Sequence, residues 1–271
     1  MIKLQYLPVA TCIWFLSTFI ITYIIAVLRK DVPYFLPYIS EAGTFPPESC
    51  VFGQLMNLGA LIMLFGICVR YCQVKHDIKT KNIRLHPKWN TVSLKLGAVG
   101  SLGISMVGNF QESNMLGIHL VGAIMAIGVS SAYLLLQTKI SYAYLYARTR
   151  SIPKWLFYLR LLLSVPLIPM LIAVLILGGL ALAKFTGNSK RWWTEEDGGY
   201  TYRIASALLE WILAIMIFLY VYTFKNEMGC IEFEGVCFKI NDRKQENDTT
   251  ENNGKQTNRI KPFSTEKPHT H

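Results

Sequence analysis

Charged residues are scarce in this sequence of 271 residues, where they make up 16% of the chain, against about a quarter in a soluble domain. The charges that are present crowd into a few short stretches and into the last part of the chain, and long runs carry almost none. This distribution excludes a soluble enzyme, a disordered protein and a secreted disulfide scaffold. Hydrophobic residues account for 52%, so the composition indicates a protein that crosses a membrane several times.

Motifs that carry catalysis or bind cofactors are also missing. No stretch has the pattern of a phosphate-binding loop, a paired-histidine metal helix, a nucleophile elbow or a Cys-x-x-Cys site. Glu195, Glu196 and Asp197 form an acidic run, but the twelve-residue calcium pattern is absent. The sequence therefore predicts no enzyme, no cofactor and no metal. The formal charge of +10 does not indicate nucleic-acid binding, because no soluble domain is present to carry a basic groove.

Six apolar segments are each long enough to bridge a hydrocarbon core, which takes about 20 helical residues. Because backbone polar groups must be paired in lipid and the segments show no alternation, we expect helices rather than a barrel. The sequence thus predicts an all-α polytopic membrane protein with a six-helix bundle over residues 1–225. Residues 226–271 are expected to form a cytosolic tail that is mostly disordered. The expected spans are 7–28, 50–69, 92–110, 116–138, 155–183 and 204–224.

Basic residues in the short loops predict the orientation. One side of the membrane would carry more of them than the other, and the positive-inside rule places both termini and the second and fourth loops in the cytosol. The cation-rich side holds Lys3, Arg70, Lys75, Lys79, Lys81, Arg84, Lys88, Lys139, Arg148, Arg150 and Lys154. The opposite side holds Arg29, Lys30, Lys184, Lys190, Arg191 and Arg203.

Cysteines and one sequon mark possible modification sites. Only Cys50 is expected near the outer face, so no disulfide is predicted within the chain. Cys72 and Cys230 would lie beside the membrane on the cytosolic side, where S-palmitoylation is an alternative to inert thiols. Asn247 heads an N-glycosylation sequon, which we expect to be unused because the tail is placed in the cytosol.

Polar side chains inside the spans need a reason, since ionisable groups there are costly. Asn57, Asn109, His119 and Glu210 fall in the outer halves of four different spans. They predict one interior hydrogen-bonded cluster, which either fixes helix register or handles an ion or proton, and in which Glu210 is neutral or paired, for example with Arg203. Lys95, Lys139 and Arg160 lie near the cytosolic ends, and we expect their side chains to snorkel to water.

The third expected span carries a stripe of small residues. Ser93, Gly97, Ser101 and Ser105 are spaced by four, so they share one helix face. Small residues allow close helix approach, and the stripe predicts tight packing against the fourth span within the monomer, with contact between protomers as the alternative. In the fifth span, Pro166 and Pro169 predict a kink.

The connection between the first two spans, residues 35–52, is a stiff loop in which prolines limit φ and a glycine permits a turn. Its characteristic residues are Pro37, Tyr38, Ser40, Gly43, Pro46, Pro47, Glu48 and Ser49. This loop, with the Val107–Glu112 run, His119 and Glu210-Trp211, resembles the signature of the DRAM family of damage-regulated autophagy modulators within the Frag/DRAM/Sfk group. The Pro-Pro-Glu-Ser-Cys stretch looks most like the branch associated with the plasma membrane and endosomes.

The resemblance implies a six-span, non-enzymatic regulator of macroautophagy and cell survival in endolysosomal or plasma membranes. Its partners would be the lipid bilayer, anionic lipids and cytosolic or membrane proteins that the sequence does not identify. Two alternatives remain open: a small transporter or channel that uses the four-residue polar cluster, and an organiser of phosphoinositide signalling at the plasma membrane.

Overall fold

The computed structural model describes residues 2–149, 151–187 and 192–233. They belong to one compact unit that spans residues 1–234, and the described part contains six helices long and apolar enough to cross a membrane. The prediction of an all-α, six-span fold is therefore confirmed. The expected disordered tail beyond residue 233, with the Asn247 sequon, lies outside the described residues.

The elements follow the chain in a simple up-and-down order. The helical segments are η1 (Leu4–Tyr6), α1 (Leu7–Leu28), η2 (Glu41–Gly43), α2 (Glu48–Lys79), α3 (Pro87–Asn109), α4 (Leu116–Ala123), η3 (Ile124–Val129), α5 (Ser130–Leu145), α6 (Lys154–Ser164), α7 (Leu167–Lys184), η5 (Glu195–Asp197), α8 (Tyr200–Tyr222) and α9 (Lys225–Met228). Two-residue strands β1 (Ile2–Lys3) and β2 (Glu232–Phe233) pair antiparallel.

Several helices are longer than the apolar segments from which they are predicted. α2 has 32 residues, or about 48 Å at 1.5 Å per residue, which exceeds a hydrocarbon core of roughly 30 Å. Hydropathy detects only the lipid-facing part of such a helix. The predicted span at residues 50–69 therefore misses the turns of α2 that carry Gln73 and Asp77 beyond it.

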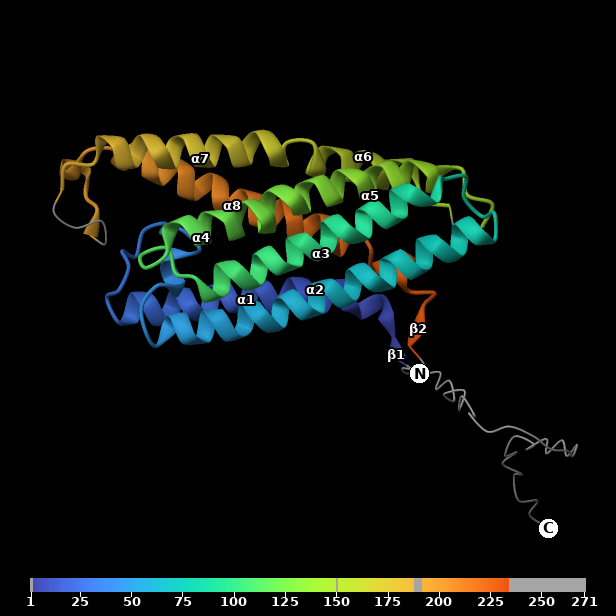
Figure 1. The fold of residues 1–271 in the computed structure, drawn as a ribbon, viewed down its shortest axis with the longest axis horizontal. Helices are drawn as coiled ribbons and strands as arrows, with labels where there is room; N and C mark the ends of the chain where they lie inside the picture. The colour runs from blue at the N-terminus through green and yellow to red at the C-terminus, as the bar shows by residue number, and fades with distance from the viewer. Residues whose placement is uncertain (1, 150, 188–191, 234–271) are drawn as a thin grey trace, which may run out of the picture. The chain divides into compact units, whose positions relative to one another are not determined.

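Two spans are not continuous α-helices. The fifth is interrupted after Ser164, and α7 begins after Pro166, whose missing N–H cannot continue the hydrogen-bond ladder. Figure 1 shows the break between α6 and α7. The fourth contains the π-helical segment η3 between α4 and α5. A π-helical turn of this kind is uncommon and often lies at a functional site.

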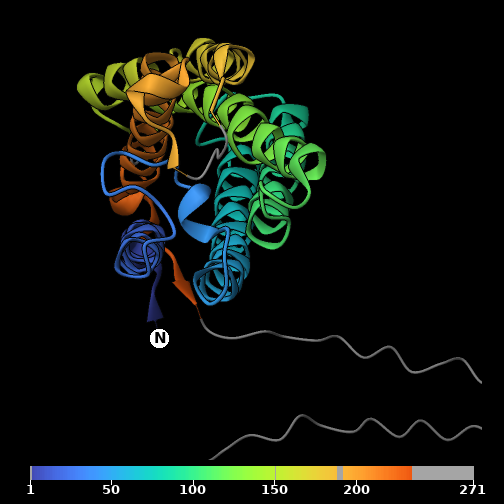
Figure 2. The same ribbon diagram turned by 90° about the vertical axis from the view of Figure 1, so that its left-hand side faces the viewer.

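The spans pack in a closed ring. α1 contacts α2, α2 contacts α3, α3 contacts α4 and α5, α5 contacts α6, and α8 contacts α6, α7 and α1. Figure 2 shows this ring from the end that carries residues 29–47, 110–115, 185–187 and 192–199, which we call the loop end. The short helix η2 lies near the centre of the ring in this view. The opposite end, with β1, β2 and residues 80–86, 146–149 and 151–153, is called the terminal end.

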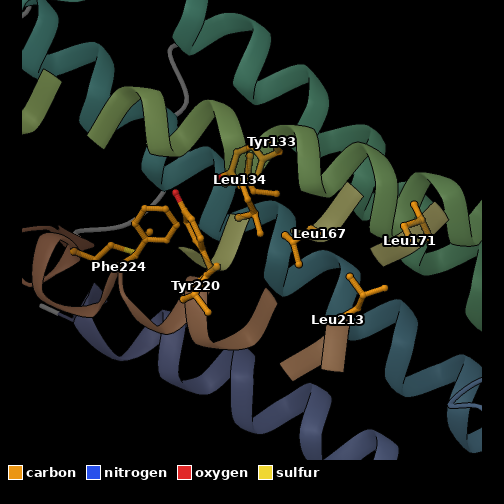
Figure 3. Packing of buried hydrophobic residues seen from close by; sticks show 10 residues of the cluster. Tyr133, Leu134, Leu167, Leu171, Leu213, Tyr220 and Phe224 are labelled. Atoms are coloured by element: carbon orange, nitrogen blue, oxygen red, sulfur yellow. The ribbon is translucent and has the colours of Figure 1, made fainter. Parts of the chain in front are cut away.

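The main apolar core lies between α5, α7 and α8. Figure 3 shows Tyr133 and Leu134 of α5 beside Tyr220 of α8 and Leu167 of α7. In lipid there is little hydrophobic drive between helices, so close packing and interhelical hydrogen bonds carry the association. One such bond joins the Tyr220 hydroxyl to Thr138 Oγ1 at 2.9 Å.

Candidate functional site

The α1–α2 loop is held over the ring by α8. Glu210 Oε2 accepts a hydrogen bond from the backbone N–H of Ile39 at 2.9 Å. The indole N–H of Trp211 donates to the carbonyl oxygen of Pro37 at 3.0 Å. Because Glu210 and Trp211 are adjacent on a rigid helix, they fix the loop at two positions. We call these contacts, with the Arg203–Glu41 pair described next, the loop clamp.

The third contact of the loop clamp is a buried ion pair. Arg203 Nη2 lies 2.6 Å from Glu41 Oε2, and the arginine side chain is 1% exposed. The guanidinium carbon lies 5.8 Å from the ring centroids of both Tyr38 and Trp193, so aromatic faces cover a cation that water does not reach. The expected pairing of Arg203 with Glu210 is wrong, because Glu41 of the loop takes that place.

Burial changes the acid–base chemistry of the loop residues outside the spans. Burial raises the pKa of the Glu41 carboxyl above its ordinary value, and the Arg203 guanidinium opposes the rise. Burial also raises the pKa of the Tyr38 hydroxyl to about 12, against a hydrogen bond with Ser206. Tyr38 donates its backbone N–H to Glu41 Oε2 at 3.0 Å. The loop is thus a desolvated polar structure rather than a solvated connection.

The remaining signature residues shape the entry into α2. Pro47 occupies the N-cap position of α2, and Ser49 donates its backbone N–H to the carbonyl oxygen of Phe45 at 2.8 Å. Gly43 lies against the Phe52 ring, and any β-carbon there would overlap that ring. Glu48 is fully buried, with Arg29 Nε at 3.8 Å. The other predicted members of the loop, Ser40 and Pro46, lie within the same folded segment.

The four residues of the predicted polar cluster divide into separate groups. Asn57 and Asn109 exchange amide hydrogen bonds of 3.1 and 2.9 Å, and Ser105 Oγ donates to Asn57 Oδ1 at 2.6 Å. His119 Nδ1 lies 2.7 Å from the carbonyl oxygen of Phe110. Glu210 bonds the loop. Among the described residues the hydrogen bonds therefore form a register lock between α2 and α3 rather than one four-helix network.

Part of the small-residue stripe of α3 faces a different neighbour from the one expected. A β-carbon on Gly97 would meet the Ile67 side chain of α2 at 2.8 Å, and Ser105 bonds Asn57 of the same helix. Ser93 accepts a hydrogen bond from Gln137 of α5. Ser101 donates its hydroxyl to the Gly97 carbonyl within α3. The expectation that this stripe packs on the fourth span holds for Ser93, which bonds α5 of that span, and is wrong for Gly97 and Ser105, which face α2.

The third and fourth spans do approach closely, through another face. A β-carbon on Gly103 would meet the backbone nitrogen of Ala126, and one on Gly100 would meet Ser130 Oγ. On the other helix, a β-carbon on Gly122 would meet Met106 Cβ at 2.9 Å. The close contact between α3 and the α4–η3 run therefore depends on Gly100 and Gly103.

A buried ionic cluster at the terminal end was not foreseen. Glu227 of α9 contacts Arg70 Nη1 at 3.2 Å and pairs with Arg160, and the three side chains are 8%, 1% and 0% exposed. The Phe224 ring lies between the guanidinium groups, 4.9 and 4.6 Å from their carbons. The expected snorkelling of Arg160 to water is wrong. One sequence feature could have indicated this cluster: an arginine lies inside each of the apolar runs Cys68–Cys72 and Phe157–Leu163.

Other predicted sites remain as expectations. Cys72 and Cys230 are both exposed, as acylation would require, but no modification is present to test it. Among residues 2–149, 151–187 and 192–233, no group of three or more histidine, cysteine, aspartate or glutamate side chains is arranged to hold a metal ion.

Six apolar helices, a clamped loop at one end and buried ion pairs at both ends define a polytopic helical membrane protein. The family model described as the Frag1/DRAM/Sfk1/Cwh43P N-terminal domain matches residues 3–230. The chain belongs to this family, as its resemblance in the loop and in the third span had indicated.

Three relatives illustrate this membership. It is 33% identical over 234 residues to DNA damage-regulated autophagy modulator protein 2 of Homo sapiens, covering 82% of each chain. It is 33% identical over 245 residues to DNA damage-regulated autophagy modulator protein 1 of Homo sapiens, covering 88% of this chain and 94% of that one. Over 138 residues it is 38% identical to the modulator of macroautophagy TMEM150B-B of Xenopus laevis, half of this chain. No solved structure matches it.

Proposed function

We propose that this chain is a non-enzymatic multi-pass regulator of macroautophagy and cell survival that acts in endolysosomal or plasma membranes. The observation that carries the proposal is the similarity to two human proteins named as autophagy modulators, over 82% and 88% of this chain. The family model covers residues 3–230, which contain the six spans and the clamped loop. A role that depends on the whole fold is therefore better supported than one that depends on a single motif.

The connection between α2 and α3 is the surface we assign to partner recruitment. Lys79, Lys81 and Arg84 are all exposed at the terminal end, and each cation near an anionic membrane surface contributes about 1 kcal/mol of attraction. Because the Asn90 side chain of α3 donates a hydrogen bond to the carbonyl oxygen of Tyr71 in α2 at 2.9 Å, the two helices that carry this basic connection are tied together close to it. Anionic lipid and acidic segments of cytosolic proteins are the partners that its charge fits.

A transporter or channel is the second candidate, and the cavity beside Glu210 and His119 is the observation in its favour. A transport path would need the polar groups to follow one another across the bundle. Asn57 and Asn109 instead bond each other outside the lining of that cavity. Because these polar residues form separate groups, the role of a regulator is better supported than that of a transporter.

Neutralising the basic connection tests the proposed function. Cells that lack the endogenous protein would be supplied with the Lys79→Gln, Lys81→Gln, Arg84→Gln variant, and autophagic flux and recruited proteins would be measured. We expect loss of most recruitment, because three cations at about 1 kcal/mol each are removed, together with reduced rescue of flux. The charge-preserving variant Lys79→Arg, Lys81→Arg, Arg84→Lys should behave as wild type. Full rescue by the neutral variant would refute this assignment.

The cytosolic placement of both termini is likewise a proposal, supported by the basic residues that remain exposed at the terminal end. Arg70 no longer counts among them because it is buried with Glu227, whereas Lys75, Lys79 and Lys81 are exposed. Proximity labelling from an enzyme fused to the C-terminus should therefore biotinylate cytosolic proteins, together with endosomal and lysosomal membrane proteins. Labelling confined to lumenal proteins would reverse the orientation, and the S-palmitoylation proposed for Cys72 and Cys230 would then fail with it.

A further inference from the structure

A cavity of about 130 Å³ lies inside the ring of helices. Its walls come from α1, α2, α3, α8 and the α4–α5 run, and they are almost entirely apolar. The side chains that form most of the wall are Phe15, Phe19, Phe52, Met56, Ile217 and Phe218. We call it the central cavity. A dry apolar space of about 150 Å³ is large enough to bind benzene, so the central cavity has room for a hydrocarbon segment.

The π-helical segment contributes to this space. Ala126 and Ile127 of η3 line the central cavity, and Ala123 precedes them on the same wall. A π-turn inserts an extra residue into the helix and displaces its wall locally. Small side chains and a displaced helix therefore coincide at one place in the bundle. This coincidence makes a binding site a better explanation than a simple packing defect.

Three polar residues of the central cavity, His119, Glu210 and Ser40, lie at its loop end and present hydrogen-bond acceptors, while Ser130 and Tyr133 of α5 bring hydroxyl groups to its wall further along. His119 uses Nδ1 on the Phe110 carbonyl, so a neutral ring donates from Nδ1 and keeps Nε2 as an acceptor. Glu210 uses one carboxylate oxygen on Ile39, and its other oxygen has no hydrogen-bond partner among the described residues. Ser40 donates its hydroxyl to Glu112, which leaves only its lone pairs. A ligand head at this end must therefore donate hydrogen bonds.

The charge around this end opposes an anionic ligand. Glu210 and Ser40 line the central cavity, and Ser40 connects to the carboxylate of Glu112. The next residue, Glu41, pairs with Arg203. A carboxylate or phosphate head would meet the Arg203 guanidinium only where Glu41 already engages it. An ammonium or hydroxyl head would meet acceptors of the complementary sign.

The apolar space continues toward the terminal end. A second, smaller cavity of about 30 Å³ is lined by Leu7, Pro8 and Thr11 of α1, and it shares Met63, Ile67, Tyr133 and Val221 with the central cavity. The two spaces thus follow α1 and α8 along the bundle axis. Two apolar spaces that follow one another along the bundle suit an unbranched chain.

We propose that the central cavity holds the head and the adjoining methylene groups of a single-chain lipid whose head donates hydrogen bonds and carries no negative charge, with the head at Glu210 and His119 and the chain directed toward Tyr133. The head is an amine or a hydroxyl. This site is independent of the proposed role in autophagy, since it concerns a ligand inside the bundle and not a partner at its surface.

Photolabelling of the full-length protein in lipid nanodiscs tests the site. Three probes would share one photoreactive, alkyne-tagged alkyl chain and differ only in the head, which is an amino alcohol, a glycerol or a carboxylate. After irradiation, labelled peptides are mapped by mass spectrometry. We expect the amine and glycerol probes to label cavity-lining segments such as Met56 and Phe218. The carboxylate probe should label them about tenfold less, which corresponds to 1.4 kcal/mol.

Variants distinguish labelling inside the cavity from labelling at the lipid-facing surface. Ala214→Leu places a larger side chain in the cavity wall and should remove most of the specific labelling, whereas Ala10→Leu, on an exposed face of α1, should leave it unchanged. Glu210→Gln should reduce labelling by the amine probe and spare the glycerol probe, which tells the two head groups apart. Thermal unfolding of each variant shows that the fold is retained.

The wild-type map is decisive even if a variant fails to fold. Labels found only on lipid-facing peptides would overturn the site, as would equal labelling by Ala214→Leu and Ala10→Leu. Equal or stronger labelling of the cavity by the carboxylate probe would overturn the assignment of the head group. None of these outcomes bears on autophagic flux, so the two proposals fail separately.

Discussion

Glu227→Gln should destabilise the bundle by about 3–5 kcal/mol, the usual cost of removing one partner from a buried ion pair. The substitution keeps the size of the side chain and one carbonyl acceptor but removes the negative charge. Arg70 and Arg160, at 1% and 0% exposure, would then be two buried cations with no counter-ion in the cluster. Their hydrogen bonds to Gln137 and Ser141 hold the guanidinium groups in place and prevent them from reaching water.

The measurement is the midpoint of unfolding in mild detergent by heat and by added denaturing detergent. Glu232→Gln is the matched control, because Glu232 lies five residues further along the chain and is exposed, and we expect no change from it. The combined variant Arg70→Met, Arg160→Met, Glu227→Leu should recover most of the lost stability, since an apolar replacement of a whole buried ionic group is often neutral. Equal midpoints for Glu227→Gln and Glu232→Gln would show that the cluster is not coupled to folding.

This cluster also explains why part of the structure is hard to foresee. Six spans are readable from the sequence because lipid forces every backbone group into an internal hydrogen bond, so apolar length predicts a helix. The same reasoning assigns each arginine near a span end to water. Arg160 instead finds Glu227, which is 67 residues away in the chain. The position of Glu227 is set by the short helix α9, which follows α8 and contacts η1 and α1, and no local sequence pattern predicts that arrangement.

The loop clamp likewise has features that the sequence predicts and features that it does not. The stiffness of residues 35–52 is apparent from their prolines, and the cost of a carboxylate in a span marks Glu210 as unusual. The partner of Glu210 is a backbone N–H, at Ile39, which carries no side-chain signature. Arg203 has a candidate partner seven residues away on its own helix, yet it pairs with Glu41, 162 residues earlier. Sequence spacing identifies helix faces but not which loop covers them.

The π-helical segment η3 is a further feature that periodicity does not reveal. A six-residue π-turn changes which residues of the fourth span share a face. Gly122, Ala126 and Ser130 of the fourth span all lie near α3, but they face Gly103 and Gly100 rather than the serine stripe. The direction in which a small-residue face points depends on the whole ring of helices.

Gly103→Ala should therefore be far more damaging than Gly97→Ala, although the serine stripe makes Gly97 the more conspicuous residue. A β-carbon at 103 would meet backbone atoms of Ala126 and Gly122, and backbone cannot move aside without separating the helices. At Gly97 it would meet side-chain atoms of Ile67, which can shift without moving the backbone of α2. We expect a loss of about 1–3 kcal/mol for Gly103→Ala, as for other overpacked sites, and a smaller loss for Gly97→Ala.

Gly179→Ala provides the reference, because nothing lies within 4 Å of a β-carbon at that position of α7. Alanine is better than glycine inside a helix by roughly 0.5–1 kcal/mol, so this variant should be slightly more stable than wild type. Subtracting its effect isolates the steric term at positions 97 and 103, as the three changes are chemically identical. Unfolding midpoints in detergent give the order directly. If Gly97→Ala proves the more damaging, α3 would have to present its serine stripe and not its glycine face to the fourth span.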